Sequence, residues 1–521
     1  MPKTITLTLS PREAADECIY RARAARELRI NESDIALLRI VKRSVDARRG
    51  ALKVNLSLEA YLDFEPQPKP LHFDYPSVVG AREVVVVGAG PAGLYAALRL
   101  IELGLRPVMF ERGKEVVERG KDIARIQRNL GINPDSNYAF GEGGAGTFSD
   151  GKLFTRSKKR GDYNRALQRL VYHGASPEIL YEAHPHIGSD RLPRIIADMR
   201  RQIIECGGEI HFERRVTGFR TKQGRIYGVE VGDDIVEADI VVVATGHSAR
   251  DIYRTLHASG IRLEAKPYAM GVRIEHPQRL INNIQYHRDR EMEYLPAASY
   301  SIVRQVGGRG VYSFCMCPGG FIVPAMTDAA ESVVNGMSPS RRNSPFANSG
   351  FVTEIREEDF AHLVPEYGAL AGLEFQSHLE RAARQASPDR QVAPAQRVAD
   401  FVAGRASTSL PASSYVPGLV ASRLDEWLPD FMGTRLREAI READRNMRGY
   451  LTNEAVVVGV ESRTSTPVRI PRDRTTLMHP EVEGLYPAGE GAGYAGGIIS
   501  AALDGERIAE AVAESVNREC R

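Results

Sequence analysis

The sequence predicts an α/β fold in which a discontinuous domain built on a parallel sheet is interrupted by an inserted α+β domain and preceded by a small N-terminal βαββ domain. Three apolar, strand-like runs support this prediction: one enters a glycine-rich turn at 88–93, one ends in Ala-Thr-Gly at 244–246, and one ends in Ala-Gly-Glu at 488–490. Short apolar runs rich in β-branched residues are typical of buried parallel strands. Because the third run lies near the C-terminus, the domain that begins with the first run is expected to close with the end of the chain.

The glycine-rich turn has the composition of a Rossmann-like, nucleotide-binding site. Gly88 permits a tight turn, Gly90 lets the backbone approach a pyrophosphate, and Gly93 lets the following helix pack closely on the strand. Pro91, followed by Ala92, suits a first helical turn because proline has no N–H to lose there. The phosphates are therefore expected at the positive end of this helix.

A second strand and an acidic residue complete the motif. The apolar run 106–110 ends in Glu111, followed by Arg112. Glu111 stands about 20 residues after the glycines, where an acidic side chain can accept a hydrogen bond from a ribose 2′-hydroxyl. Two other segments, 141–146 and 491–496, match the same glycine spacing but lack this order of strand, helix, strand and acid. The first motif therefore predicts a bound adenine dinucleotide.

Composition narrows the class of protein. A chain of 521 residues has room for about three domains, and 43% hydrophobic with 26% charged residues is typical of a soluble globular protein. The net charge of +2 and the short basic cluster at 158–160 do not indicate a nucleic-acid partner. No apolar run reaches the roughly 18 residues of a membrane span, and no signal peptide is recognised, so a cytoplasmic localisation is expected. Five cysteines do not form a disulfide framework in so long a chain.

The order of the motifs divides the chain into parts. Residues 1–75 are expected to form the N-terminal α+β domain, which a proline-rich linker at 64–70 connects to the rest. Residues 80–261 are expected to form the first part of the nucleotide-binding domain, and 460–521 its C-terminal part. Between them, 262–459 reads as strands followed by helices, which predicts an inserted substrate or cap domain over the reactive end of the cofactor.

A glycine-rich loop after the second strand is a further candidate for cofactor contact. No helix-like segment follows it directly, and its bare backbone N–H groups can bind an anion. Gly144, Ala145, Gly146 and Thr147 would wrap the cofactor, and Lys152 would lie near its phosphates or its electron-rich end. A flexible surface loop is the alternative interpretation.

Longer motifs resemble one group of flavoproteins. The strand that ends in Ala-Thr-Gly and the late Gly-Glu before a Gly-Gly helix resemble the glutathione-reductase-like FAD-binding superfamily. More closely, the chain resembles the bacterial FAD-dependent, or NAD(FAD)-utilising, dehydrogenase family in five segments: 141–152, 244–251, 315–320, 461–467 and 487–497. The resemblance implies a tightly held FAD and an oxidoreductase activity. One departure is Glu490, where many members of the superfamily have aspartate; glutamate can make the same bond to a ribityl hydroxyl.

The resemblance also implies where each part of FAD would lie. The pyrophosphate would contact the first glycine motif, the adenosine ribose Glu111, the adenine the backbone of Val216, and the ribityl chain Gly489 and Glu490. The helix that begins near Gly497 would direct its positive end at the O2 edge of the flavin, where negative charge gathers on reduction. The full set of expected FAD contacts is Gly88, Gly90, Pro91, Ala92, Gly93, Glu111, Arg112, Gly144, Ala145, Gly146, Thr147, Lys152, Val216, Ala244, Thr245, Gly246, Gly489, Glu490, Gly496, Gly497 and Ile498.

Candidate catalytic residues lie in and after the inserted domain. Cys315 and Cys317 are either redox-active thiols or cysteines packed in a strand. The spacing favours packing, because residues two apart in a strand are about 6–7 Å from Cα to Cα, at the outer limit for a disulfide. Arg273 and Arg463 could clamp a carboxylate over the flavin, with structural ion pairs as the alternative. His247 could act as an acid or base or could cap its turn. No metal site is expected, since zinc would need two more ligands than this cysteine pair supplies.

Together these inferences predict an FAD-dependent oxidoreductase that passes electrons between a small-molecule substrate and a tightly bound, non-covalent FAD. NADH or NADPH is a candidate electron donor, although the two further glycine matches do not predict a separate NAD(P) fold. Two alternatives stay open. One is a flavin-holding binding or regulatory protein without turnover. The other is a flavin-dependent RNA-modifying enzyme, which the absence of a basic face in the sequence disfavours.

Overall fold

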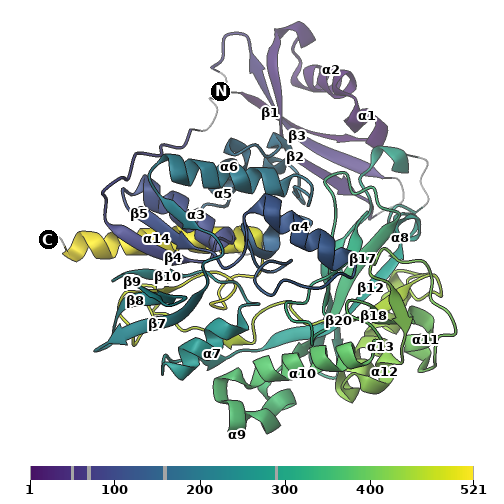
Figure 1. The fold of residues 1–521 in the computed structure, drawn as a ribbon. Coiled ribbons are helices and arrows are strands. Elements are labelled where there is room, and N and C mark those ends of the chain that lie inside the picture. Colours follow the sequence, from purple (N-terminus) through teal and green to yellow (C-terminus); the bar gives the residue numbers. More distant parts are fainter. Residues whose placement is uncertain (1, 49–51, 67–71, 156–160, 288–290, 520–521) are drawn as a thin grey trace.

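The computed structural model describes residues 2–48, 52–66, 72–155, 161–287 and 291–519. The basic cluster 158–160 and the linker residues 67–71 lie outside these ranges. The described residues form a mixed α/β fold with a small N-terminal sheet, a parallel sheet and a larger, mostly antiparallel sheet (Figure 1). None of the helices in these ranges is long and apolar enough to cross a membrane.

The N-terminal unit is a three-stranded antiparallel sheet covered by two helices. Its elements are β1 (Lys3–Leu9), α1 (Pro11–Ala15), α2 (Glu17–Leu28), β2 (Ile35–Asp46) and β3 (Lys53–Leu62), with the strand order β1-β3-β2. Ser10 and Glu13 form a capping box that starts α1. Alternate strand residues such as Leu7 and Leu56 pack against Tyr20 and Ala24 of α2. Every second strand residue therefore faces the helices.

The parallel sheet brings together strands from distant parts of the chain. Its order is β22-β10-β4-β5-β6, and all neighbours pair in parallel. The strands are β4 (Glu83–Val87), β5 (Arg106–Phe110), β6 (Glu209–His211), β10 (Val241–Val243) and β22 (Leu485–Pro487). The predicted start of strand, helix and strand is confirmed, with α3 (Pro91–Glu102) between β4 and β5. β22 shows that the C-terminal part of the chain returns to the sheet begun by β4.

Both faces of the parallel sheet are buried. Val84, Val86 and Val242 face a core made with α3, α6 (Leu192–Glu205) and α14 (Ile498–Glu519). Val85 and Val243, on the opposite face, pack against a core that includes the small sheet β7-β8-β9 and α7. Burial on both faces explains why these strands are continuous valine runs. Further elements of this region are α4 (Val116–Gln127), α5 (Tyr163–Tyr172), β7 (Val216–Lys222), β8 (Arg225–Val231), β9 (Asp234–Glu237) and α7 (Arg250–Ala258).

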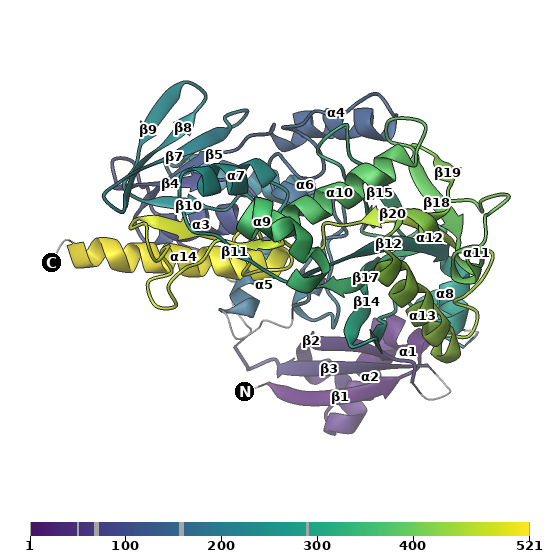
Figure 2. The ribbon, with the colours of Figure 1, turned by 90° about the horizontal axis from the view of Figure 1, so that it is seen from below.

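The inserted region is built on a seven-stranded sheet with the order β13-β14-β17-β12-β20-β18-β19. Figure 2 shows this sheet beside the parallel-sheet region, with the N-terminal unit below β14 and β17. Its strands are β12 (Tyr268–Pro277), β13 (Val303–Val306), β14 (Arg309–Cys317), β17 (Phe346–Ile355), β18 (Ala393–Arg397), β19 (Leu419–Ala421) and β20 (Val456–Glu461). Its helices are α8 (Gln278–Gln285), α9 (Val364–Tyr367), α10 (Ala371–Gln385), α11 (Val398–Ala403), α12 (Leu424–Trp427) and α13 (Asp430–Asn446). Two short pairs complete the strands, β15 (Phe321–Pro324) with β16 (Val334–Met337), and β11 (Glu264–Ala265) with β21 (Val468–Arg469).

Some elements that the local residue pattern predicts differ in the structure. The pattern of 209–216 predicts one strand, but this strand stops at His211, because Glu213 turns the chain with φ +56°, and Val216 starts a separate hairpin. The pattern of 360–384 predicts one helix, which is interrupted before α10 by Gly368, with φ +52°. The pattern of 395–403 also predicts a helix, but this segment begins as β18, since its first residues pair with β20. Pairing with a distant strand overrides local helix preference at this last position.

A buried cluster of ion pairs joins the two larger regions. Arg250 of α7 reaches Glu331 at 2.6 Å and Glu380 of α10 at 2.8 Å. Arg463, directly after β20, reaches the same two carboxylates at 2.6 Å and 3.0 Å. We call these four residues the interdomain ion cluster. The cluster fixes the inserted region against the parallel-sheet region.

Candidate functional site

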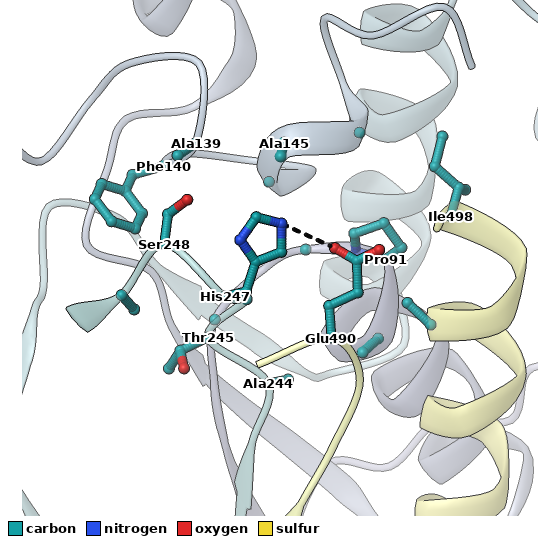
Figure 3. A pocket seen from close by; sticks show the side chains of 18 of the residues that line it. Pro91, Ala139, Phe140, Ala145, Ala244, Thr245, His247, Ser248, Glu490 and Ile498 are labelled. Carbon is teal, nitrogen blue, oxygen red and sulfur yellow. Dashed lines mark ion pairs between the residues drawn. The ribbon is translucent and has the colours of Figure 1, made fainter. Parts of the chain in front are cut away.

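A cavity of about 360 Å³ opens at the carboxyl ends of β4 and β10, between the parallel sheet and the inserted region. Ligands of open parallel sheets bind at this edge. Most of the residues expected to contact FAD line it: Gly88, Gly90, Pro91, Ala92, Glu111, Arg112, Gly144, Ala145, Gly146, Lys152, Val216, Ala244, Thr245, Gly246, Glu490, Gly496, Gly497 and Ile498. Of the candidate catalytic residues, Cys315 and Arg463 line it as well. Figure 3 shows part of this wall, with His247 facing Glu490.

Three expected contacts do not line the cavity, for identifiable reasons. A Cβ on Gly93 would lie 2.0 Å from the carbonyl oxygen of Gly88, so Gly93 serves the close packing of helix on strand that was predicted for it. Thr147 is buried and donates to the carbonyl of Glu142 at 2.7 Å. Gly489 donates its N–H to Asp504 at 2.8 Å, below the cavity wall.

The start of α3 offers unsatisfied donors to the cavity. Gly90 is the N-cap, and no side chain caps the first turn. The first N–H groups of a helix have no partner within the helix and carry its positive end. A Cβ on Gly90 would meet only the Cα of Gly144, at 3.9 Å. Two glycine segments therefore meet with bare backbone beside the space in front of the helix, which suits a phosphate group.

Glu111 is held at the cavity wall by backbone donors. Its Oε2 accepts the N–H of Ala89 at 2.9 Å, and its Oε1 accepts those of Gly113 and Gly141 at 2.9 and 3.0 Å. A carboxylate has about four acceptor positions, so one remains for a hydroxyl group. Arg112 is engaged on both sides, with Asp135 and Asp251. These contacts fix the acidic end of the motif before any ligand binds.

His247 and Glu490 form a pair on the other side of the cavity. Nε2 of His247 lies 3.6 Å from Oε2 of Glu490. Burial, with the charges of Arg463 and Arg250, lowers the pKa of His247 to about 4. Burial, with the nearby Cys315, raises the pKa of Glu490 to about 7. Near neutral pH the imidazole is uncharged and the carboxyl group exchanges a proton, so the pair can hold or release one proton.

Lys152 does not point at free space in the cavity but at two sulfur atoms. Its Nζ lies 3.7 Å from Sγ of Cys315 and 3.5 Å from Sγ of Cys317. The same ammonium lies 3.1 Å from Oδ2 of Asp150. Cys315 faces the cavity, whereas Cys317 is 0% exposed behind it. The glycine-rich loop and β14 thus meet at a cluster of one cation and two thiols.

The two candidate arginines are both in ion pairs. Arg273 is fully buried and its Nε donates to Glu461 at 2.8 Å, and it does not line the cavity. Arg273 therefore has the structural ion pair, which is one of the two roles considered for it. To clamp a carboxylate over the cofactor, its side chain would have to point into the cavity. Arg463 belongs to the interdomain ion cluster and reaches the rim of the cavity.

Comparison with known proteins defines the family. Residues 267–464 match the model of the family described as FAD-dependent protein, C-terminal domain-like, and residues 1–61 match a domain of unknown function, DUF8436. An uncharacterized protein of Clostridium beijerinckii is 39% identical over 516 residues, which cover 95% of this chain and 96% of that protein. The chain belongs to the family of this clostridial protein.

Other likenesses of this family member are more distant. The probable electron transfer flavoprotein-quinone oxidoreductase YdiS of Escherichia coli is 26% identical over 164 residues, 32% of this chain and 36% of that protein. The flavin-dependent brominase Bmp2 covers 84% of this chain and 80% of its own, with 13% identity and a TM-score of 0.37. A geranylgeranyl bacteriochlorophyll reductase-like protein of Thermoplasma acidophilum covers the same shares, with 12% identity and a TM-score of 0.34. At these TM-scores neither structure carries an inference about the site.

Several residues of the site in this family member escaped prediction from the sequence. Asp150 and Phe314 line the cavity beside Lys152 and Cys315, and Ser248 and Asp251 follow His247 along it. Each stands within a few positions of a predicted residue. The motifs therefore indicated the segment that lines the cavity but not which of its side chains face the cavity. Among the residues that the structure describes, no group of three or more His, Cys, Asp or Glu side chains could hold a metal ion.

The raised pKa of Glu490 predicts a pH dependence of stability in this family member. The folded protein binds a proton at Glu490 up to about pH 7, whereas an unfolded glutamate releases it near pH 4.3. Between these values the folded state binds more protons, so the stabilising contribution is lost as pH rises through 7. In cofactor-free protein, the free energy of unfolding of Glu490→Gln relative to that of the wild type should therefore rise by about 1–3 kcal/mol from pH 5 to pH 8. Urea unfolding of both proteins at pH 5 and at pH 8 measures this difference.

The control for this prediction is Glu510→Gln, whose side chain is half exposed in a surface ion pair with Arg99. It should track the wild type within about 0.5 kcal/mol at both pH values. Equal pH slopes for Glu490→Gln and the wild type would contradict the raised pKa.

Proposed function

We propose that the protein is an FAD-dependent oxidoreductase that transfers electrons between a small-molecule substrate and a tightly bound, non-covalent FAD. The observation that carries the proposal is the cavity at the start of α3, where uncapped helix N–H groups, bare glycine backbone from two segments and the fixed Glu111 converge. The match of residues 267–464 to FAD-dependent proteins supports the choice of cofactor. The name of the YdiS relative, an oxidoreductase, supports the reaction class.

The donor set of the cavity fits FAD. The first turn of α3, together with the adjacent backbone of Gly90 and Gly144, would hold the pyrophosphate. Glu111 would accept a ribose hydroxyl with its remaining acceptor position. Gly496, Gly497 and the start of α14 line the same cavity, with Ile498 next to Gly146, and would face the flavin. When bound, a flavin would supply hydride-transfer chemistry.

The residues around the cavity have three tasks in this proposal. The N-terminus of α14 offers positive potential where negative charge would develop. The pair of His247 and Glu490 holds a proton at the Glu490 carboxyl group and can release it near neutral pH. The inserted region covers the cavity and limits access of water, and the interdomain ion cluster holds it in place.

Two measurements test the proposal. Protein purified without added cofactor should be yellow, and heat should release FAD that chromatography separates from FMN. Anaerobic addition of NADH or NADPH, or of a chemical reductant as a positive control, should then bleach the visible flavin band. Release of FMN, or of no flavin, would contradict the assignment of FAD as the cofactor. Bound FAD that the chemical reductant bleaches but neither nicotinamide does would exclude nicotinamide as the donor.

A further inference from the structure

Two thiols and a lysine meet at the wall of the cofactor cavity. Sγ of Cys315 and Sγ of Cys317 both lie within hydrogen-bonding range of the Lys152 ammonium, at 3.7 and 3.5 Å. The Cys317 thiol also donates to the carbonyl oxygen of Cys315 at 3.2 Å. Cys315 is partly exposed to the cavity, so only the first of the two sulfur atoms is within reach of a bound molecule.

The backbone at these cysteines is not a regular strand. The pairing register of β14 with β17 shifts between Phe314 and Cys317, and Cys315 has φ +46°. A positive φ is uncommon for a residue with a side chain and clusters at functional sites. The backbone of Cys315–Cys317 is not regular extended strand, so the Cα spacing that disfavours a disulfide in a regular strand does not apply to these two cysteines. The bulge turns both side chains toward the same cation, which a flat strand would not require.

The charges around the cluster favour an ionised sulfur. Asp150 is shared by two cations, Lys152 at 3.1 Å and Arg342 at 2.8 Å. Arg273 and Glu461 neutralise each other beside the cluster. Glu490 is protonated below about pH 7. In that range one positive charge remains beside the thiols, and a thiolate would balance it.

The two thiols divide the charge unequally. The neighbouring Cys317 thiol, together with the positive charges of Lys152 and Arg273, lowers the pKa of Cys315 well below its usual range. The neighbouring Cys315 sulfur and burial raise the pKa of Cys317. Low pKa and access mark a nucleophilic thiolate, and a buried protonated neighbour marks a resolving thiol. Cys315 has the first set of properties and Cys317 the second.

We propose that Cys315 and Cys317 form a thiol–disulfide exchange couple that acts on a disulfide substrate entering the cofactor cavity. The Cys315 thiolate attacks one sulfur of the substrate disulfide, and the other sulfur leaves and takes up a proton. Cys317 then loses its proton and attacks Sγ of Cys315, which releases the second substrate thiol and leaves a Cys315–Cys317 disulfide. The substrate disulfide gains two electrons and two protons; the cysteine pair supplies both electrons and the Cys317 proton, and solvent supplies the second proton.

The inference deepens the proposed function and rests on it in one respect, since the two-electron donor that restores the dithiol is the reduced flavin proposed for the same cavity. The exchange itself needs only the cysteine pair and a disulfide. It can therefore be tested in the purified protein without turnover.

The test traps the mixed disulfide. Full-length wild type and the Cys317→Ser variant are reduced, freed of reductant and treated with oxidised glutathione. One tryptic peptide, 310–341, contains both cysteines, so its mass reports the outcome. The wild-type peptide should lose two hydrogens and carry no glutathione. The Cys317→Ser peptide should carry one glutathione on Cys315. A wild-type peptide that stays a dithiol, or a Cys317→Ser peptide without glutathione, would overturn the proposal.

Cys18, which is exposed on α2, is the internal reference thiol. At pH 6 iodoacetamide should label Cys315 at least tenfold faster than Cys18. Lys152→Met, which keeps the length of the side chain, should move the pH profile of Cys315 labelling upward by at least one pH unit, whereas a merely structural lysine would leave the profile in place. Labelling of Cys315 no faster than Cys18 would overturn the proposal.

The colour of the same samples separates this proposal from the proposed function. Yellow protein that does not form the trapped disulfide would contradict the proposed thiol couple but not the proposed flavin oxidoreductase. Colourless protein that forms the trapped disulfide would support the thiol couple and contradict the assignment of FAD as cofactor.

Discussion

Gly90→Val is expected to give a folded, colourless protein. The Cβ of a residue at position 90 would touch only the Cα of Gly144, at an ordinary van der Waals distance of 3.9 Å. Gly90 has φ −76° and ψ −176°, which any residue adopts. The β-carbon of the valine therefore fits the protein, whereas its methyl groups would compete with a ligand for the space in front of the first N–H groups of α3. If that space holds the pyrophosphate, bound FAD should fall at least tenfold.

The stability of Gly90→Val has to be compared with that of cofactor-free wild type. Loss of a bound ligand lowers stability by itself, so both proteins are compared without FAD. There the variant should be destabilised by only about 1 kcal/mol, the scale of a poor N-cap residue. Gly93→Ala is the contrasting variant. Its Cβ would lie 2.0 Å from the Gly88 carbonyl oxygen, so it should lose stability as well as colour, by about 1–3 kcal/mol or more. A yellow Gly90→Val protein with full FAD content would contradict the assignment of the cavity.

Local rules predicted the start of the parallel sheet because sequence and structure agree there over a short span. The glycine spacing, the proline in the first turn and the valine run all specify the same unit, and β4, α3 and β5 follow it closely. The cavity lining could be predicted for the same reason, since the carboxyl ends of parallel strands meet at one edge. Gly88, Gly90 and Glu111 accordingly line the cavity, as their positions in the motif predict.

The chemistry at the other end of the cavity could not be predicted from local patterns. Lys152 is 163 and 165 positions from the two cysteines that it contacts, and no periodicity reports such a pairing. The bulge at Cys315 arises from pairing between β14 and β17, which a single run of residues does not specify. β12, which carries Arg273, is buried on both faces. Its pattern therefore gave no indication of the face to which the arginine points.

Glu380→Ala should cause the largest loss of stability among the substitutions discussed. Glu380 is 0% exposed and accepts hydrogen bonds from Arg250 at 2.8 Å, from Arg463 at 3.0 Å and from Ser462 at 2.5 Å. Burial opposes its ionisation, yet the two arginines lower the pKa of Glu380 to about 2, whereas burial and Glu380 itself raise the pKa of Glu331 to about 7. Glu380 is thus the main counter-ion of two buried guanidinium groups. Removing one member of a buried ion pair costs about 3–5 kcal/mol.

The effect of Glu380→Ala should reach the cavity as well as the fold. Arg463 lines the cavity rim and is held there by Glu331 and Glu380, so the variant should bind FAD more weakly in addition to melting at lower temperature. Glu374→Ala on the same helix is the matched control, because its partner Arg254 is half exposed and can be hydrated when the carboxylate is lost. That control should cost no more than about 1 kcal/mol. Thermal melts and FAD content of the two variants, measured side by side, decide the point: equal stabilities would mean that the interdomain ion cluster does not hold the two regions together.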